Sequence, residues 1–208
     1  QSQPWLKQTA RNSWFWGNAL NPLDTRTLSK KFAGWREFSG RKSFCSGSAD
    51  SEMLIASALD ESTRGKLLIA AIPSHRTGIT LHGDWDNIGQ RQTDSGSATF
   101  ERVRVEENEL LLDPGPLSTP FACLRPLIAQ LTFVNIFLGI AEGAFEEARN
   151  YTLKEARPWF KANVSQANQD PYVLRHYGEF WVGLEGVRLL TERANALLDK
   201  AWSKEQRL

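Results

Sequence analysis

The chain has 208 residues, which is enough for one large domain or two small ones with a buried core. Its 25 Lys and Arg nearly balance its 24 Asp and Glu, giving a formal net charge of +1. This balance argues against nucleic acid or an anionic membrane as a partner.

Cysteine and histidine are sparse. Cys45 and Cys123 lie far apart and belong to no metal-ligand spacing. We expect them to be reduced, buried thiols of a cytoplasmic protein, with a disulfide as the alternative. His75, His82 and His176 are scattered, so no metal site is expected.

The first candidate binding stretch is aromatic and runs from residue 12 to residue 22. Its central residues read W-F-W-G-N, in which Gly17 and Asn18 follow Trp16. Gly17 lets the backbone approach another group closely, and the Asn18 amide carries both a donor and an acceptor. The alternative is a strand end closed by a turn.

The second candidate stretch reads G-R-K-S-F-C-S-G and covers residues 40–47. It follows short strands that we expect to break at Ala33-Gly34 and at Ser39-Gly40. Ser46 is either a ligand-binding hydroxyl or a turn serine before a glycine. Further along, the apolar runs 53–56 and 67–72 predict buried strands on either side of a polar hairpin.

Residues 84–105 join a bend rich in Gly and Ser to an alternating strand. The side chains of the strand are expected to point alternately to two faces: Phe100, Arg102 and Arg104 to one, and Glu101, Val103 and Val105 to the other. Trp85 in the bend borders a cavity in one interpretation and belongs to the core in another.

A linker rich in Pro and Gly, residues 110–120, predicts a domain boundary. We expect a domain over residues 1–113, a linker over 114–120 and a helical part over 121–208. A long helix over 121–156 is apolar on both faces, which favours a buried helix of a bundle over a membrane span. Asp170-Pro171 predicts the start of a second helix that ends near Trp202.

Several motifs together resemble the acyl-CoA dehydrogenase superfamily, and most closely its branch of dibenzothiophene monooxygenase-like, reduced-flavin monooxygenases. They are W-F-W-G-N, F-C-S-G, D-W-x-x-I-G-Q-R-Q-T-D-S-G, and R-P-W followed by D-P-Y and Y-G-E-F. The resemblance implies an α+β fold: an antiparallel β-barrel-like middle domain, then long helices of a C-terminal four-helix bundle. An N-terminal helical domain and the last bundle helices would be missing, so we expect a fragment or processed chain that binds flavin weakly and is inactive in isolation.

The resemblance also implies roles for individual residues. Asn18 and Ser46 would be catalytic and stabilise an oxygen adduct of the flavin. The residues expected to contact the cofactor are Trp16, Gly17, Phe44, Ser46, Trp85 and Arg157. Of these, Ser46 would donate a hydrogen bond near the flavin N5, and Arg157 would bind the flavin phosphate of a neighbouring subunit through its planar fork of donors.

The implied function is oxidation of a small apolar organosulfur compound by reduced FMN and O2, through a flavin hydroperoxide. A flavin reductase would supply the reduced FMN, and the enzyme would be a cytoplasmic homo-oligomer, most simply a tetramer. One alternative is an acyl-CoA dehydrogenase that uses FAD, although its usual T-E-P-x-x-G-S-D wording is absent. A second alternative is a non-catalytic chain that acts only as an oligomerising domain.

Overall fold

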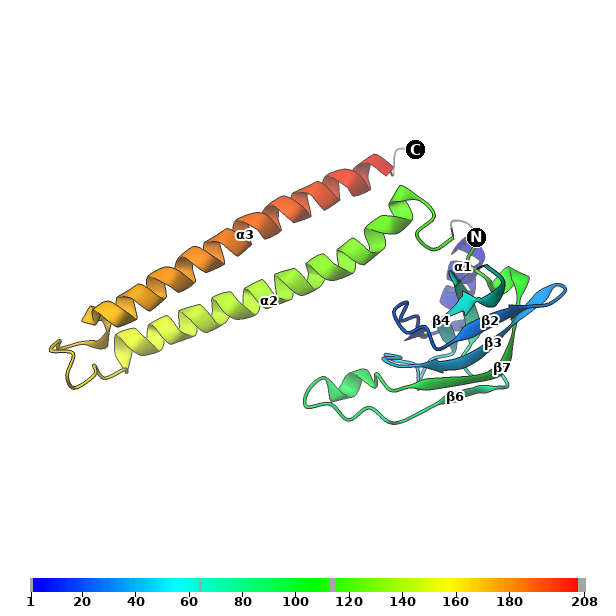
Figure 1. The fold of residues 1–208 in the computed structure, drawn as a ribbon, viewed down its shortest axis with the longest axis horizontal. Helices are drawn as coiled ribbons and strands as arrows, with labels where there is room; N and C mark the ends of the chain where they lie inside the picture. Colours follow the sequence, from blue (N-terminus) through cyan, green and yellow to red (C-terminus); the bar gives the residue numbers. More distant parts are fainter. Residues whose placement is uncertain (1, 64, 113–114, 206–208) are drawn as a thin grey trace. The chain divides into compact units, whose positions relative to one another are not determined.

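The computed structural model describes residues 2–63, 65–112 and 115–205 (Figure 1). The chain forms two compact units, residues 1–122 and residues 123–208. The predicted boundary at residues 113 and 114 lies outside the described residues.

The first unit is a seven-stranded curled sheet with one helix at its start. The strands are β1 (Trp16–Ala19), β2 (Leu28–Lys31), β3 (Trp35–Lys42), β4 (Met53–Asp60), β5 (Lys66–Pro73), β6 (Ile79–Leu81) and β7 (Ala98–Glu106). They are ordered β1-β4-β2-β3-β7-β6, and β5 pairs with β4. The predicted α+β class is confirmed. The sheet is mixed, because β1 and β2 both run parallel to β4 while the other pairs are antiparallel.

The apolar core of this unit is formed mainly by side chains of β1, β3, β4, β5 and β7. The two predicted apolar runs form β4 and β5, which pair along their whole length, and nearly every residue of β4 is buried. The core residues are Ala19, Phe38, Cys45, Leu54, Ala56, Ala58, Leu68, Ala70, Ile72, Ala98, Phe100, Val103, Val105 and Leu110. Small residues in β4 and β5 let the rest of the core pack closely against them.

A β-bulge overturns the predicted alternation of β7. Phe100, Val103 and Val105 are all buried, so Phe100 shares a face with the two valines and not with the arginines. The cause is one extra residue in β7: the pairing shifts between Phe38 with Val103 and Gly40 with Phe100, and Arg102 takes a φ of 51°.

The predicted strand break at Ser39-Gly40 is also wrong, because β3 continues through it. Gly40 has a φ of 140°, and a Cβ there would collide with the Arg26 carbonyl. The Ser39 hydroxyl accepts a hydrogen bond from the Arg102 N–H (3.1 Å). The glycine therefore accommodates the bulge and does not end the strand.

The first helix, α1 (Ser2–Asn12), was not predicted from the sequence. It packs against β1 through two tryptophans, since the rings of Trp5 and Trp16 meet edge to face with centroids 6.0 Å apart. The Trp16 indole N–H also donates to the Thr9 hydroxyl (2.9 Å).

The second unit is an antiparallel pair of long helices, α2 (Pro120–Lys154) and α3 (Pro171–Glu205) (Figure 1). As predicted, Asp170 caps α3, because its carboxylate accepts a hydrogen bond from the Tyr172 N–H (2.8 Å). Side-chain hydrogen bonds join the two helices at two places. Near the connecting loop, the Thr152 and Tyr177 hydroxyls are 2.6 Å apart, and in the middle of the helices Arg188 Nε donates to Glu142 (2.8 Å).

The prediction that the first long helix is buried on all sides is wrong for this chain. No described residue of α2 is buried, and Phe137 and Ile140 are 65% and 61% exposed. A single partner helix can cover only one stripe of α2, so its other apolar residues face outward. Length and composition alone would also let α2 cross a membrane, which is weak evidence because core helices of bundles pass the same test.

Both cysteines are thiols outside any disulfide, but only one is buried as predicted. Cys45 belongs to the core of the first unit, whereas Cys123 near the start of α2 is exposed.

The ion pair between Arg36 and Asp60 generates a prediction about acid stability. Their side chains are 12% and 3% exposed, with Arg36 Nη2 3.1 Å from Asp60 Oδ2. Burial alone would raise the pKa of Asp60, but hydrogen bonds from Arg36 and Ser62 outweigh it and lower that pKa. The ionised carboxylate therefore adds stability above its unfolded-state pKa of about 4, and this stability is lost as the pH falls below that value.

We expect Asp60→Asn to lower the free energy of unfolding by about 3 kcal/mol at pH 7, because it leaves Arg36 buried without its charge partner. Urea unfolding between pH 3 and pH 7 measures this loss of stability. It also shows whether the free energy of unfolding of the variant falls less steeply at acid pH than that of the parent chain. Asp50→Asn, at an exposed position, is the control and should change the free energy by less than about 0.5 kcal/mol. Equal stability of Asp60→Asn and the parent chain at pH 7 would contradict this account.

Candidate functional site

The candidate site is built around the turn that joins β3 to β4. Phe44 has a φ of 60°, which is unusual for a bulky residue, and Gly47 has a φ of 65°. The Cys45 N–H donates to the Gly96 carbonyl (2.9 Å), and the Gly47 N–H donates to the Thr93 carbonyl (3.0 Å). These two bonds, called the backbone clamp below, tie the turn to the loop that precedes β7.

The Cys45 side chain anchors the turn from below. It is fully buried in the core, and this burial raises the pKa of the thiol to about 11. The thiol therefore stays protonated near neutral pH and packs as a small apolar group, not as a nucleophile.

Asn18 and Ser46, the two predicted catalytic residues, lie next to each other. The Asn18 N–H donates to the Ser46 carbonyl (3.0 Å), and the Asn18 Oδ1 accepts from the Leu20 N–H (2.8 Å). Both residues are exposed. The side-chain amide nitrogen of Asn18 and the Ser46 hydroxyl thus both lie at the surface where β1 meets the turn.

Gly17 makes this close approach of β1 and the turn possible. A Cβ at residue 17 would lie 2.6 Å from Ser48 Cα and 2.7 Å from Ser51 Oγ. Real Cβ atoms essentially never come that near to backbone. The predicted role of Gly17, close backbone approach, therefore has a structural basis in its contact with the turn itself.

A chain of side-chain hydroxyls continues from Ser46 into the loop before β7. Ser46 Oγ lies 2.7 Å from Ser95 Oγ, which in turn lies 2.8 Å from Thr93 Oγ1. The Thr93 hydroxyl donates to the Gln90 carbonyl (2.8 Å). We call Ser46, Ser95 and Thr93 the hydroxyl chain.

Sequence reasoning missed Thr93 and the link between the members of the hydroxyl chain. Thr93 and Ser95 lie in the T-D-S-G part of the motif in residues 84–96; Ser95 was matched only generically to a wall of the site, and Thr93 was assigned no role. Their spacing could have suggested side chains on one side of a turn, but only the structure shows that Ser46, far away in sequence, completes the chain.

Two aromatic side chains flank the exposed side of the turn. Phe44 is 59% exposed, and its ring meets that of Trp85 edge to face, with centroids 6.0 Å apart. Trp85 is half-buried and lies outside the apolar core, and its indole N–H donates to the Gln90 carbonyl (2.9 Å). A planar ligand would find aromatic and hydroxyl groups together here.

Lys42 at the end of β3 holds the loop that follows β1. Its ammonium group is buried and donates to the carbonyls of Asn21 (3.0 Å) and Asp24 (2.6 Å). Burial lowers the pKa of Lys42. The Asp24 carboxylate accepts a hydrogen bond from Arg26 Nε (2.8 Å), which lowers the pKa of Asp24 to about 2.

Asp84 fixes the start of the loop that carries Trp85. Its carboxylate accepts hydrogen bonds from the Ser97 N–H (2.7 Å), the Ser97 hydroxyl (2.5 Å) and Arg41 Nη2 (3.1 Å). The bonds from Ser97 lower the pKa of Asp84. The two ends of the loop are therefore held together at residues 84 and 97.

The remaining predicted contacts are placed differently. Trp16 is half-buried and its indole N–H is engaged by α1, so it supports β1 from the helix side. Arg157 is exposed and lies in the second unit, in the loop between α2 and α3. Five of the seven predicted residues thus gather at the turn and its neighbours: Gly17, Asn18, Phe44, Ser46 and Trp85.

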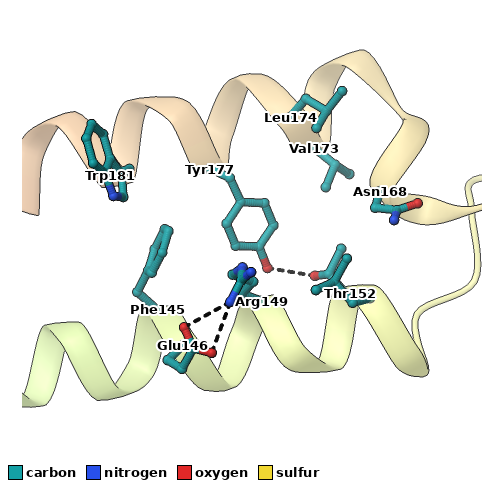
Figure 2. Close-up of a pocket in the computed structure, with 10 residues that line it drawn as sticks. Phe145, Glu146, Arg149, Thr152, Asn168, Val173, Leu174, Tyr177 and Trp181 are labelled. Carbon is teal, nitrogen blue, oxygen red and sulfur yellow. Dashed lines mark hydrogen bonds and ion pairs between the residues drawn. The ribbon is translucent and has the colours of Figure 1, made fainter.

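The second unit has an open groove of about 520 Å³ between its two helices, near their connecting loop (Figure 2). Phe145 and Trp181 lie toward one end of the groove, and the Thr152–Tyr177 hydrogen bond lies toward the other, near Val173. Glu146 and Arg149 form an ion pair along α2 (3.1 Å). None of the predicted site residues lines this groove.

The first unit offers what a flavin ring would need at its edge. It brings together a surface amide, a hydroxyl, the exposed ring of Phe44 and the half-buried ring of Trp85, held on backbone that is fixed by the clamp. Among the described residues, no three of His, Cys, Asp and Glu gather as they would around a metal ion. The amide, the hydroxyl and the aromatic rings fit an organic, planar group.

Comparison with known proteins gives close matches over the whole chain. It is 78% identical over 208 residues to the probable FMNH2-dependent monooxygenase SfnC of Pseudomonas putida, covering 100% of this chain and 53% of SfnC. It is 39% identical over 218 residues to the dibenzothiophene monooxygenase of Rhodococcus qingshengii, covering 98% of this chain and 52% of that protein. No family model matches. The chain spans about half the length of the curated relatives it matches.

Comparison with solved structures also gives matches over nearly the whole chain. Methanesulfinate monooxygenase MsuC from Pseudomonas fluorescens has a TM-score of 0.82 at 78% identity, over 98% of this chain and 53% of its own. FMN-bound TdsC from Paenibacillus sp. A11-2 has a TM-score of 0.69 at 40% identity, over 95% and 53%. A glutaryl-CoA dehydrogenase from Mycobacterium smegmatis, with a TM-score of 0.69 at 19% identity over 90% and 48%, shares the fold.

The contact between Gly17 and the turn generates a second prediction. Gly17→Ala should lower the free energy of unfolding of the first unit by about 2 kcal/mol, because its methyl group must push Ser48 away. Gly89→Ala, where a Cβ meets nothing within 4 Å, is the matched control and should stay within about 0.5 kcal/mol of the parent. Urea unfolding followed by tryptophan fluorescence compares them. A Gly17→Ala variant as stable as Gly89→Ala would contradict this account, because the turn could then shift away from the new methyl group without loss of stability.

Proposed function

We propose that this homologue of the FMNH2-dependent monooxygenases, which carries the middle and C-terminal parts of the acyl-CoA dehydrogenase fold, oxidises a small organosulfur compound with reduced FMN and O2. The observation that carries this proposal is 78% identity to SfnC over all 208 residues, a span that includes the candidate site. The adjacent Asn18 and Ser46, flanked by Phe44 and Trp85, support it from the geometry.

Each residue of the site has a definite task in this proposal. The Asn18 amide and the Ser46 hydroxyl would hold the polar edge of the flavin ring, while Phe44 and Trp85 border the ring and keep water from it. Gly17 lets β1 come close to the turn that carries Ser46. Arg157 would bind the FMN phosphate of a neighbouring subunit through its planar fork of donors.

Reduced FMN supplies two electrons, so that one oxygen atom of O2 is added to sulfur and the other leaves as water. Among organosulfur compounds we propose a small alkyl sulfinate as the substrate. The support is the 78% identity to methanesulfinate monooxygenase MsuC, against 39% to the dibenzothiophene monooxygenase.

The proposal includes partners and a compartment. A separate flavin reductase would supply reduced FMN. A homo-oligomer, most simply a tetramer, is supported by the large apolar side chains that α2 and α3 expose. A cytoplasmic location is supported by the two cysteine thiols, because thiols stay reduced there.

No observation favours the acyl-CoA dehydrogenase alternative. The chain is 26% identical to the short-chain specific acyl-CoA dehydrogenase of rat over 193 residues, well below its identity to the monooxygenases. A purely oligomerising role is not favoured either, since it would not require the arrangement around Ser46 that the site has.

The proposal is tested by mixing the purified full-length protein with anaerobically reduced FMN, O2 and methanesulfinate, and by measuring methanesulfonate by ion chromatography. Asn18→Ala and Ser46→Ala should each lower turnover on the order of 100-fold, because each removes a preorganised group at the reacting edge of the flavin. Ser203→Ala, on the exposed end of α3, is the control. Absence of product with the parent chain, for both methanesulfinate and dibenzothiophene, would reject the proposed reaction.

The proposed role of Arg157 has a separate test that uses a ligand without phosphate. Arg157→Ala should weaken binding of FMN at least about tenfold, because it removes a charged hydrogen-bond donor, while leaving binding of riboflavin unchanged. Arg157→Lys should lie between, since it keeps the charge but loses the fork. Fluorescence titration gives the Kd values, and an equal loss for FMN and riboflavin would assign Arg157 a structural role.

A further inference from the structure

The hydroxyl chain has a fixed direction, which follows from its inner end. The Gln90 carbonyl can only accept hydrogen bonds, so the Thr93 hydroxyl must donate its single hydrogen to it (2.8 Å). Thr93 Oγ1 therefore has only lone pairs left for its other neighbour. Across the 2.8 Å contact between Ser95 and Thr93, Ser95 must be the donor.

The same reasoning reaches the surface at Ser46. Because the hydrogen of Ser95 is committed to Thr93, the 2.7 Å contact between Ser46 and Ser95 requires Ser46 to donate. The only hydrogen of the Ser46 hydroxyl thus points into the protein. Toward the exposed side, Ser46 Oγ presents lone pairs alone and acts as a hydrogen-bond acceptor.

Three features keep this order from reversing. The Gln90 carbonyl also accepts from the Trp85 indole N–H (2.9 Å) and the Thr93 N–H (3.2 Å), so it stays aimed at these donors. Ser95 is buried, with 7% of its surface exposed, which leaves little room for water to compete. The backbone clamp holds residues 45–47 against residues 93–96 and so fixes the distance from Ser46 to Ser95.

We propose that this ordered hydroxyl chain selects reduced over oxidised flavin, with Ser95 and Thr93 as positioning residues. The inference rests on the proposed function and deepens it. With N5 facing Ser46, as the resemblance implies, N5 of a reduced isoalloxazine ring would carry a hydrogen that Ser46 can accept. N5 of the oxidised ring would offer a lone pair, which repels the lone pairs of Ser46. Oxidised flavin can accept a hydrogen bond from Ser46 only if the Ser46 hydroxyl turns away from Ser95. In this proposal Ser46 accepts a hydrogen bond from N5, whereas the resemblance implied that it donates one.

The test measures the Kd of oxidised FMN and, without oxygen, the Kd of reduced FMN, for the full-length protein and its variants. Ser95→Ala removes the acceptor of the Ser46 hydrogen, so the hydroxyl can turn and donate to oxidised flavin. The ratio of the two Kd values, oxidised over reduced, should fall on the order of tenfold. Thr93→Val frees Ser95 to donate to Ser46 and should lower the ratio in the same way.

Thr93→Ser is the matched control, because it keeps a hydroxyl that can donate to Gln90 and accept from Ser95, and it should keep the parent ratio. Ser203→Ala, at an exposed position on α3 and outside the hydroxyl chain, should also keep it. A mere loss of structure would weaken both redox states together and leave the ratio unchanged. Either Ser95→Ala or Thr93→Val suffices if the other does not fold.

The outcomes separate this inference from the proposed function. Parent protein that binds FMN, with a ratio that does not fall in Ser95→Ala and Thr93→Val, overturns the inference alone. Parent protein that binds neither oxidised nor reduced FMN overturns the proposed function, and the inference with it. A lower ratio in Thr93→Ser, equal to that of Thr93→Val, would also overturn the direction of hydrogen-bond donation along the hydroxyl chain.

Discussion

The site depends first on the backbone clamp between the turn after β3 and the loop before β7. Two amide hydrogen bonds, from Cys45 to Gly96 and from Gly47 to Thr93, join segments that lie far apart in sequence. The buried Cys45 side chain fixes the turn to the core, and the parallel pairing of β1 with β4 brings Asn18 to the same place. Without the clamp, the distances along the hydroxyl chain would not be set, because all its other links are side-chain hydrogen bonds of modest strength.

The part of this arrangement that the sequence predicts is the part that local patterns encode. Apolar runs predicted β4 and β5, and the Asp170 cap predicted the start of α3, because such signals act over a few residues. The candidate residues came from motifs, and motifs alone did not say that Asn18 and Ser46 share a hydrogen bond. The bulge at Arg102 was missed because it arises from pairing with β3, and alternation within β7 contains no trace of it.

The difference between what the sequence predicts and what the structure shows is largest in the second unit. Periodicity and composition predicted both long helices, yet the expected burial of the first did not follow, since burial depends on what surrounds a helix and not on its own residues. With α3 as its single described partner, α2 exposes Phe137 and Ile140. The exposed ion pair Arg188–Glu142 links the two helices in this register and would be lost in any other, although such a pair adds little stability.

The position of β4 in the sheet also has a consequence for how the first unit folds. The hairpin of β4 and β5 closes over a short connection, so it needs little loss of chain entropy. β1 and β2 both join β4 in parallel from earlier in the chain, and each must close a much longer loop. The hairpin can therefore serve as the template on which the N-terminal strands assemble late. The surface that carries Asn18 is then complete only after β1 has joined this hairpin.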